Sequence, residues 1–281
     1  MDELMTSMFR AAEGFDGDIA AMVASITEMP WDPNGRFVAL WTFITGIVNG
    51  AMIPAAGSLA TFFFLVGFLK KTIMFEFVTM ENVVKCLLRL VVAKIIIANS
   101  LIIVQGFGLV AHEILQDVID LQLEGGNEML SEGGIGKALS AEVQAKIAEF
   151  EGFGLIDKIF HFIYHIPMYL VLLVCKFFIF IQLWGRFLQI CFYSVVAPLP
   201  LAGFIAEETT SFGVSFVKNY AAVLLQGFMI FLIVDIYILF NTSLEVGAFP
   251  LELLHVQLLT SIILVFMIAK SGNWAKQLMG L

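Results

Sequence analysis

Apolar residues are concentrated in several long runs along this chain, and each run is nearly free of charge. The segments 37–69 and 187–205 contain no Asp, Glu, Lys, Arg or His. Two further runs carry one charged side chain each, Lys176 and Asp235. An α-helix rises about 1.5 Å per residue and the hydrocarbon core of a bilayer is about 30 Å thick, so roughly 20 apolar residues cross it. The pattern therefore predicts an all-α, polytopic membrane protein.

Five full spans and one broken segment account for these runs. In the first run, glycines and Pro54 separate an embedded N-terminal piece from a span at about 51–69. The other full spans are expected at 90–110, 160–183, 220–240 and 253–269. The run 187–205 is expected to break and re-enter, because Pro198 and Pro200 remove amide donors. A six-span alternative, in which this run crosses fully, stays open.

The distribution of charge orients the spans. A basic stretch lies between the first two spans and contains Lys70, Lys71, Lys85, Arg89 and Lys94. The positive-inside rule places it in the cytoplasm, where we expect these side chains to contact the inner leaflet. Within this stretch, 72–94 is predicted to be an amphipathic helix. The segment 112–158 has ten acidic residues against three lysines and is expected outside. The N-terminus is therefore predicted outside and the C-terminus inside.

The chain is expected to form one membrane domain in four parts. These parts are 1–36 with two interfacial helices, 37–111 with the first two spans, the extracytoplasmic loop 112–158, and the C-terminal bundle 159–281. The acidic start and the length of the first apolar run argue against a cleaved secretory signal.

Composition excludes several classes of function. The formal net charge is −9, which disfavours a grip on nucleic acid by bulk electrostatics. Cys86, Cys175 and Cys191 lie in apolar segments without CxxC spacing and are interpreted as packing residues. His161 and His165 could share a helix face as metal ligands, but an aromatic belt at the membrane surface fits their position better. We expect no metal, no cofactor and no catalytic site, and hence no enzyme.

Lys176 and Asp235 are the clearest ionisable side chains within predicted spans. Such groups are costly in a bilayer and often functional. They could pair with other helices or reach the surface, or they could line a hydrated passage or an ion relay. With five spans they lie at different depths, whereas with six spans they come level.

One sequence pattern resembles a known family. The run Ser194 to Phe204 reads SVVAPLPLAGF, and KNY at 218–220 and LQGFM at 225–229 follow it. This pattern resembles the TrbL-type conjugal transfer proteins, relatives of the sixth VirB protein of type IV secretion systems. The chain departs from the family pattern after the prolines, where it has two consecutive glutamates.

The resemblance implies a fold and a function. It implies an outside N-terminus, about five spans, a large extracytoplasmic loop and a cytoplasmic C-terminus. It also implies a non-enzymatic channel subunit in the bacterial cytoplasmic (inner) membrane, which passes DNA or protein with energy from separate transfer ATPases. It further implies a homo-oligomeric ring, for which it suggests a pentamer. The residues expected to shape the channel are Pro198, Pro200, Lys176, Asp235, Gln226 and Gly227.

Small residues and the absence of a repeat bear on the choice between functions. Small residues at 46, 50, 56, 57 and 60 offer surfaces for close packing between spans or subunits. The alternative function is a small-solute or ion-coupled secondary transporter, whose broken helix would be the binding site. A transporter usually has an internal repeat, and none is evident in this sequence.

Overall fold

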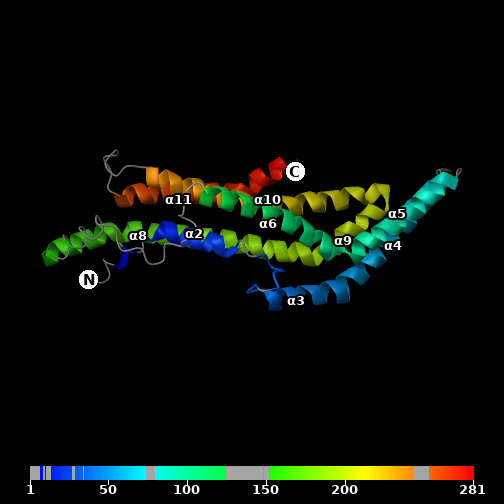
Figure 1. Ribbon diagram of the computed structural model, residues 1–281, viewed down its shortest axis with the longest axis horizontal. Helices are drawn as coiled ribbons and strands as arrows, with labels where there is room; N and C mark the ends of the chain where they lie inside the picture. The colour runs from blue at the N-terminus through cyan, green and yellow to red at the C-terminus, as the bar shows by residue number, and fades with distance from the viewer. Residues whose placement is uncertain are drawn as a thin grey trace. The chain divides into compact units, whose positions relative to one another are not determined.

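The computed structural model describes residues 7–8, 10, 14–26, 29–33, 35–73, 80–124, 148, 152, 154–243 and 253–281, and these are helical almost throughout (Figure 1). Within these ranges there is no β-strand. Five helical stretches are long and apolar enough to cross a membrane: Val38–Ile73, Ser100–Val118, Leu155–Val196, Glu207–Asn241 and His255–Leu278. The predicted all-α, multi-pass fold is confirmed.

The elements follow one another with short connections. They are α2 (Phe15–Ile26), α3 (Val38–Ile47), η1 (Val48–Met52), α4 (Ile53–Ile73), α5 (Met80–Ala98), α6 (Ser100–Glu124), α8 (Leu155–Val196), α9 (Pro198–Leu201), η3 (Ala202–Ile205), η4 (Glu207–Thr209), α10 (Thr210–Ser243) and α11 (Leu253–Leu278). The first of the two predicted interfacial helices and the centre of the acidic segment 112–158 lie largely outside the described residues.

The first apolar run is one continuous helical stretch, so its predicted division was wrong. α3, η1 and α4 follow each other without a break from Val38 to Ile73. The η1 turn is π-helical and directly precedes Pro54. A proline ring strikes the carbonyl four residues earlier in a regular α-helix, and here that carbonyl belongs to the wider turn. The wider turn therefore lets the helix pass the proline.

The second predicted span straddles a helix boundary. Residues 90–110 include the end of α5 and the start of α6, and Asn99 forms the turn between them. The Asn99 amide donates to the Ile95 carbonyl oxygen over 3.0 Å, and Ile103 N–H donates to the Asn99 carbonyl oxygen over 3.0 Å. The membrane-crossing stretch begins at Ser100, so the predicted start near residue 90 was wrong. The predicted amphipathic helix is present as α5, beginning at Met80.

The break at the prolines is confirmed, but it comes later than the predicted segment began. α8 runs without interruption from Leu155 to Val196, because nothing between its predicted end near residue 183 and Val196 breaks a helix. The chain then forms α9, η3, one extended residue and η4 before α10 begins. We call residues 197–209 the proline segment.

The described helices assemble into two compact units built from interleaved segments. The first unit comprises 1–27, 117–185 and 228–271, and the second comprises 28–116, 186–227 and 272–281. In the first unit, α2 buries Phe15, Ile19 and Val23 in the core, where Ile179 of α8 and Leu264 of α11 are also fully buried. The helical character of 15–26 is confirmed, while its place at a membrane surface stays a prediction.

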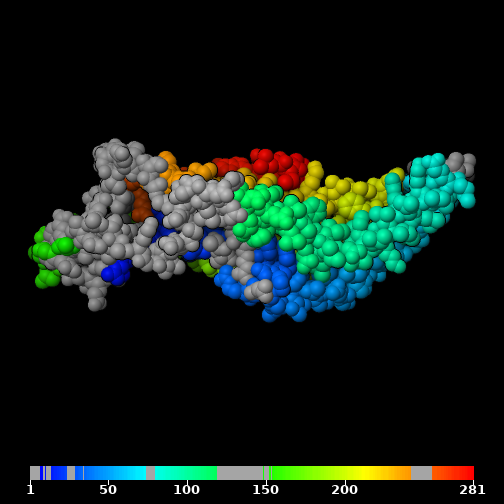
Figure 2. All heavy atoms as spheres, viewed as in Figure 1, coloured from blue at the N-terminus to red at the C-terminus, as the bar shows by residue number. Residues whose placement is uncertain are grey.

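In the second unit, the α4–α5 hairpin packs against the proline segment. α4 and α5 lie side by side, with α9 beside them (Figure 1), and their side chains meet along the hairpin (Figure 2). One buried cluster is rich in alanine and joins α4, α5 and the proline segment: Ala56, Ala60, Ala93, Ile97, Ala202, Ile205 and Ala206. Small side chains allow close approach of helices. The broken backbone is therefore shielded by protein, as an irregular segment at membrane depth must be.

Candidate functional site

The proline segment is the most buried irregular part of the second unit. Ala197 and Ala202 are fully buried, and Leu201 is nearly so. The backbone stays hydrogen-bonded where it can, since Ala197 N–H donates to the Tyr193 carbonyl oxygen over 2.9 Å. Pro198 occupies the first position of α9, where a missing amide hydrogen does no harm. The two prolines thus end α8 without leaving an orphaned donor of their own.

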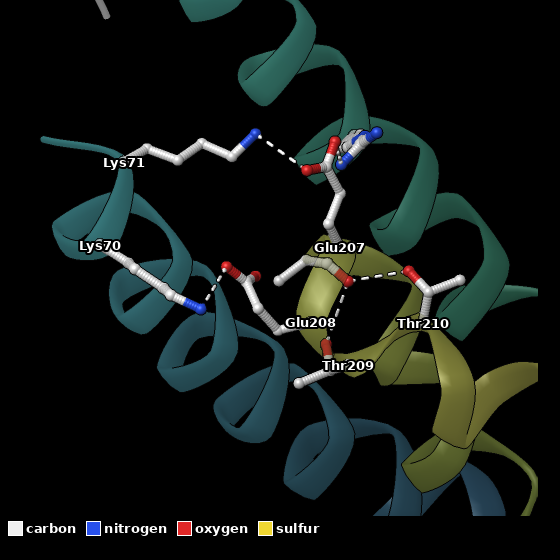
Figure 3. Close-up of polar contacts among 8 residues, drawn as sticks. Lys70, Lys71, Glu207, Glu208, Thr209 and Thr210 are labelled. Atoms are coloured by element: carbon white, nitrogen blue, oxygen red, sulfur yellow. Dashed lines mark hydrogen bonds and ion pairs between the residues drawn. The ribbon is translucent and has the colours of Figure 1, made fainter. Parts of the chain in front are cut away.

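A threonine pair closes the turn into α10. The Thr209 hydroxyl donates to the Gly203 carbonyl oxygen over 2.8 Å, and the Thr210 hydroxyl donates to the Ala206 carbonyl oxygen over 2.8 Å. Ala206 itself is extended, with φ −121° and ψ 149°. Figure 3 shows both threonine side chains turned back toward the end of the proline segment. These contacts cap the N-terminus of α10 and fix the reversal of the chain.

Two glutamates tie this turn to the α4–α5 hairpin. Lys70 Nζ lies 3.5 Å from Glu208 Oε1, and Lys71 Nζ lies 3.4 Å from Glu207 Oε2 (Figure 3). Arg89 of α5 places Nη1 2.6 Å from Glu207 Oε1. We call these five residues the charge cluster. Three of the five basic residues predicted to contact the inner leaflet therefore also bind carboxylates of the proline segment.

The sequence pattern did not reveal the role of the two glutamates, which stood out only as a departure from the family pattern. A signal was available, however: between Asp157 and Asp235 the chain contains no other acidic residue. An isolated acidic pair between apolar runs is costly unless it meets cations, and the basic stretch was the richest source of them.

A cavity lies beside the charge cluster. It encloses about 380 Å³ between α4, α5 and the end of the proline segment. One wall is apolar, formed by Phe64, Gly67, Phe68, Ile205 and Ala206, and the other is polar, formed by Lys71, Asn82, Lys85, Cys86, Arg89, Glu207 and Glu208. The volume lies in the range of small-molecule sites.

Gln226 and Gly227 serve helix packing in the second unit. A Cβ atom at Gly227 would collide with the guanidinium of Arg186. The Arg186 Nε atom donates to the Val223 carbonyl oxygen over 3.1 Å. The Gln226 side chain lies against Gly272 of α11, 3.2 Å from where a Cβ would stand. The motif LQGFM thus places a glycine where Arg186 crosses α10, and the sequence pattern gave no sign of this role for Arg186.

Lys176 has a partner that the sequence analysis did not consider. Its Nζ atom pairs with the Asp18 carboxylate of α2, within the first unit. The pairing interpretation of Lys176 is therefore the one the structure supports. Asp235 lies half-buried on α10.

Asp16 forms a second polar link between α2 and the first unit. Tyr237 OH donates to Asp16 Oδ1 over 3.0 Å, and Asn241 Nδ2 donates to Asp16 Oδ2 over 3.2 Å. Burial raises the pKa of the Asp16 carboxyl above its usual range, and the two hydrogen bonds oppose this effect. The sequence signal was two aspartates, Asp16 and Asp18, in an otherwise apolar helix.

The histidines form aromatic and hydrogen-bonded pairs in the first unit. The His161 and His165 rings stack with centroids 5.9 Å apart, and Tyr164 OH lies 2.8 Å from His255 Nε2. No group of three His, Cys, Asp or Glu side chains suited to a metal ion occurs in the described part of the chain. The contacts agree with an aromatic cluster at the end of α8.

The fold and these contacts define a multi-pass helical membrane protein with a proline-broken segment held between helices. Residues 18–198 match the model of the TrbL/VirB6 plasmid conjugal transfer like protein family, and the chain belongs to this family. It is therefore a component of a conjugal transfer system. The match runs from α2 to Pro198, so most of the pattern that carried the resemblance lies beyond it. Neither a curated protein nor a solved structure matches the chain.

Proposed function

We propose that this protein is a channel-forming structural subunit of a conjugative type IV secretion system in the bacterial cytoplasmic membrane, through which DNA or protein passes. The observation that carries the proposal is the match of residues 18–198 to a conjugal transfer family, in a chain with five membrane-crossing helices. Separate transfer ATPases would supply the energy, and the other secretion subunits would be its partners. Contact with the translocated substrate would be transient.

The passage would form between copies of the chain. Each unit fills its interior with apolar side chains, such as Ile179 and Leu264 in the first and Tyr220 and Leu201 in the second. Such close-packed cores leave no route for a polymer. A ring of identical subunits provides one, and the family resemblance suggests five of them.

Two exposed glycines support contacts between subunits. Gly46 and Gly50 are four residues apart on the first helical stretch, and both are exposed. A Cβ atom at either position would meet nothing within 4 Å. Small residues at this spacing let a second helix approach closely in a membrane. By contrast, Ala56 and Ala60 are already buried within the chain.

A photo-crosslinking scan tests the channel role and the ring together. With the crosslinker placed in turn at each exposed position of the five crossing stretches, we expect some positions to capture transferring DNA in mating donor cells. Capture should require an active transfer ATPase. We expect a crosslinker at Gly46 or Gly50 to give adducts of two or more subunits, whereas one at Phe62, which is 59% exposed on α4, should not.

Two results would count against the proposal. A donor that transfers normally while no position captures DNA would contradict the channel role. Ion-coupled uptake of a small solute by the purified protein in liposomes would favour the secondary transporter instead.

We also propose that the N-terminus and the 112–158 segment lie outside and that α5 and the C-terminus lie inside, on the basis of the charge distribution. After replacement of the three native cysteines, an impermeant maleimide should label Leu130→Cys in intact cells but not Met80→Cys. Labelling of Met80→Cys without Leu130→Cys would reverse the orientation. Permeabilised cells, in which both positions react, provide the control.

A further inference from the structure

The cavity beside the charge cluster combines two chemistries at one place. Its apolar wall includes the Phe64 and Phe68 rings of α4, and its polar wall includes Lys85 and Arg89 of α5. We propose that this cavity is a binding site for the headgroup of an anionic phospholipid, with the phosphate held by Lys85 and Arg89 and the glycerol end against the phenylalanines. The proposal rests on the multi-pass membrane fold and does not depend on the channel role.

The cations have capacity for a further anion. Four cations, Lys70, Lys71, Lys85 and Arg89, face three carboxylates, Glu81, Glu207 and Glu208. The Arg89 guanidinium has five N–H donors, and Nη1 is the atom that meets Glu207. Lys85 pairs with Glu81 on its own helix over 2.6 Å, but both side chains are about two-thirds or more exposed, at 67% and 73%. Such an exposed pair contributes little, so a phosphate can compete for Lys85.

The position of the cavity favours a lipid over a free anion. Lys70 and Lys71 directly follow the apolar part of α4, so the cavity lies level with the end of a membrane-crossing stretch. Beside it, α4 and α5 expose large apolar side chains, including Leu65, Leu69, Leu88 and Val91. A ligand with an anionic head and apolar chains satisfies both surfaces, whereas inorganic phosphate would use the polar wall alone.

The purified full-length protein in detergent allows a direct test by native mass spectrometry. We expect phosphatidylglycerol to remain bound at concentrations where phosphatidylcholine does not. Lys85→Gln should weaken phosphatidylglycerol binding about tenfold, as expected for loss of one charge-assisted contact. Lys94→Gln is the matched control, since Lys94 is an exposed cation of the same helix that does not line the cavity. Glu81→Gln should tighten binding severalfold by removing the competing carboxylate.

The controls distinguish a specific lipid site from diffuse charge attraction and from a site for a free anion. Equal losses from Lys85→Gln and Lys94→Gln would mean a diffuse electrostatic effect and would overturn the proposal, as would no loss from either. Displacement of the lipid by millimolar glycerol 3-phosphate or inorganic phosphate would assign the site to a free anion and would also overturn it. Because Lys85 is largely exposed, its variant should melt at the wild-type temperature without lipid, and Lys85→Arg should retain binding.

Discussion

Removal of this chain from a donor cell is expected to reduce conjugative transfer to background, a loss of several orders of magnitude in transfer frequency. The reason is that a conjugal transfer component that spans the membrane offers no bypass for a polymer that must cross it. Growth and ordinary solute uptake should be unchanged. Transfer frequency per donor in a mating assay provides the measurement.

A copy of the wild-type chain supplied from a second replicon should restore transfer. This complementation excludes effects on neighbouring genes. If the deletion strain transferred at the wild-type frequency, the assignment to the transfer system in that cell would fail. If solute uptake fell along with transfer, the transporter alternative would gain support.

Substitution of Gly203 by alanine is expected to destabilise the second unit by about 1–3 kcal/mol, the usual cost of forcing an extra group into a packed site. A Cβ atom at this position would lie 2.6 Å from the Thr209 carbonyl oxygen and 3.3 Å from the Phe212 Cβ atom. The nearest obstacle is backbone, which cannot rotate away as a side chain can. The substitution should therefore open the turn between η3 and α10 and lower the thermal midpoint of the purified protein.

Gly185 provides the matched control for this prediction. It lies within α8, and a Cβ atom there would meet nothing within 4 Å. Gly185→Ala should leave the thermal midpoint unchanged or raise it, because alanine is favoured over glycine in a helix interior by about 1 kcal/mol. A Gly203→Ala protein that melts at the wild-type temperature would show that the turn is not as tightly packed as the contacts indicate.

The long helices have a consequence for how the protein meets the membrane. At about 1.5 Å per residue, the 42 residues of α8 follow a path of about 63 Å, and the 34 residues of α10 one of about 51 Å. The hydrocarbon core is about 30 Å thick, and even a tilt of about 40° lengthens the crossing only to about 39 Å. Part of each helix therefore extends beyond the core.

The charge cluster shows why a basic stretch can have two roles. Lys70, Lys71 and Arg89 follow the positive-inside pattern, which concerns membrane orientation. The same side chains meet Glu207 and Glu208, which ties the proline segment to the α4–α5 hairpin. Each exposed pair contributes at most about 1 kcal/mol, so the buried alanine contacts hold the hairpin and the ion pairs fix its register.

The sequence by itself determined the helical, multi-pass class, the break at Pro198 and Pro200 and the family. These features depend on local properties: the length of apolar runs, the missing amide donor of proline and a short pattern of residues. The orientation predicted from charge rests on the same kind of evidence and stays a prediction.

Tertiary structure alone decided how the runs are joined and which polar groups meet. Pro54 did not end its helix, because a π-helical turn precedes it, whereas Pro198 did, because a second proline follows two residues later and neighbouring helices shield the opened backbone. Lys176 found Asp18, a residue 158 positions away. Nothing local to either residue encodes this pairing, since it requires α2 to fold onto α8, and that is settled by packing over the whole unit.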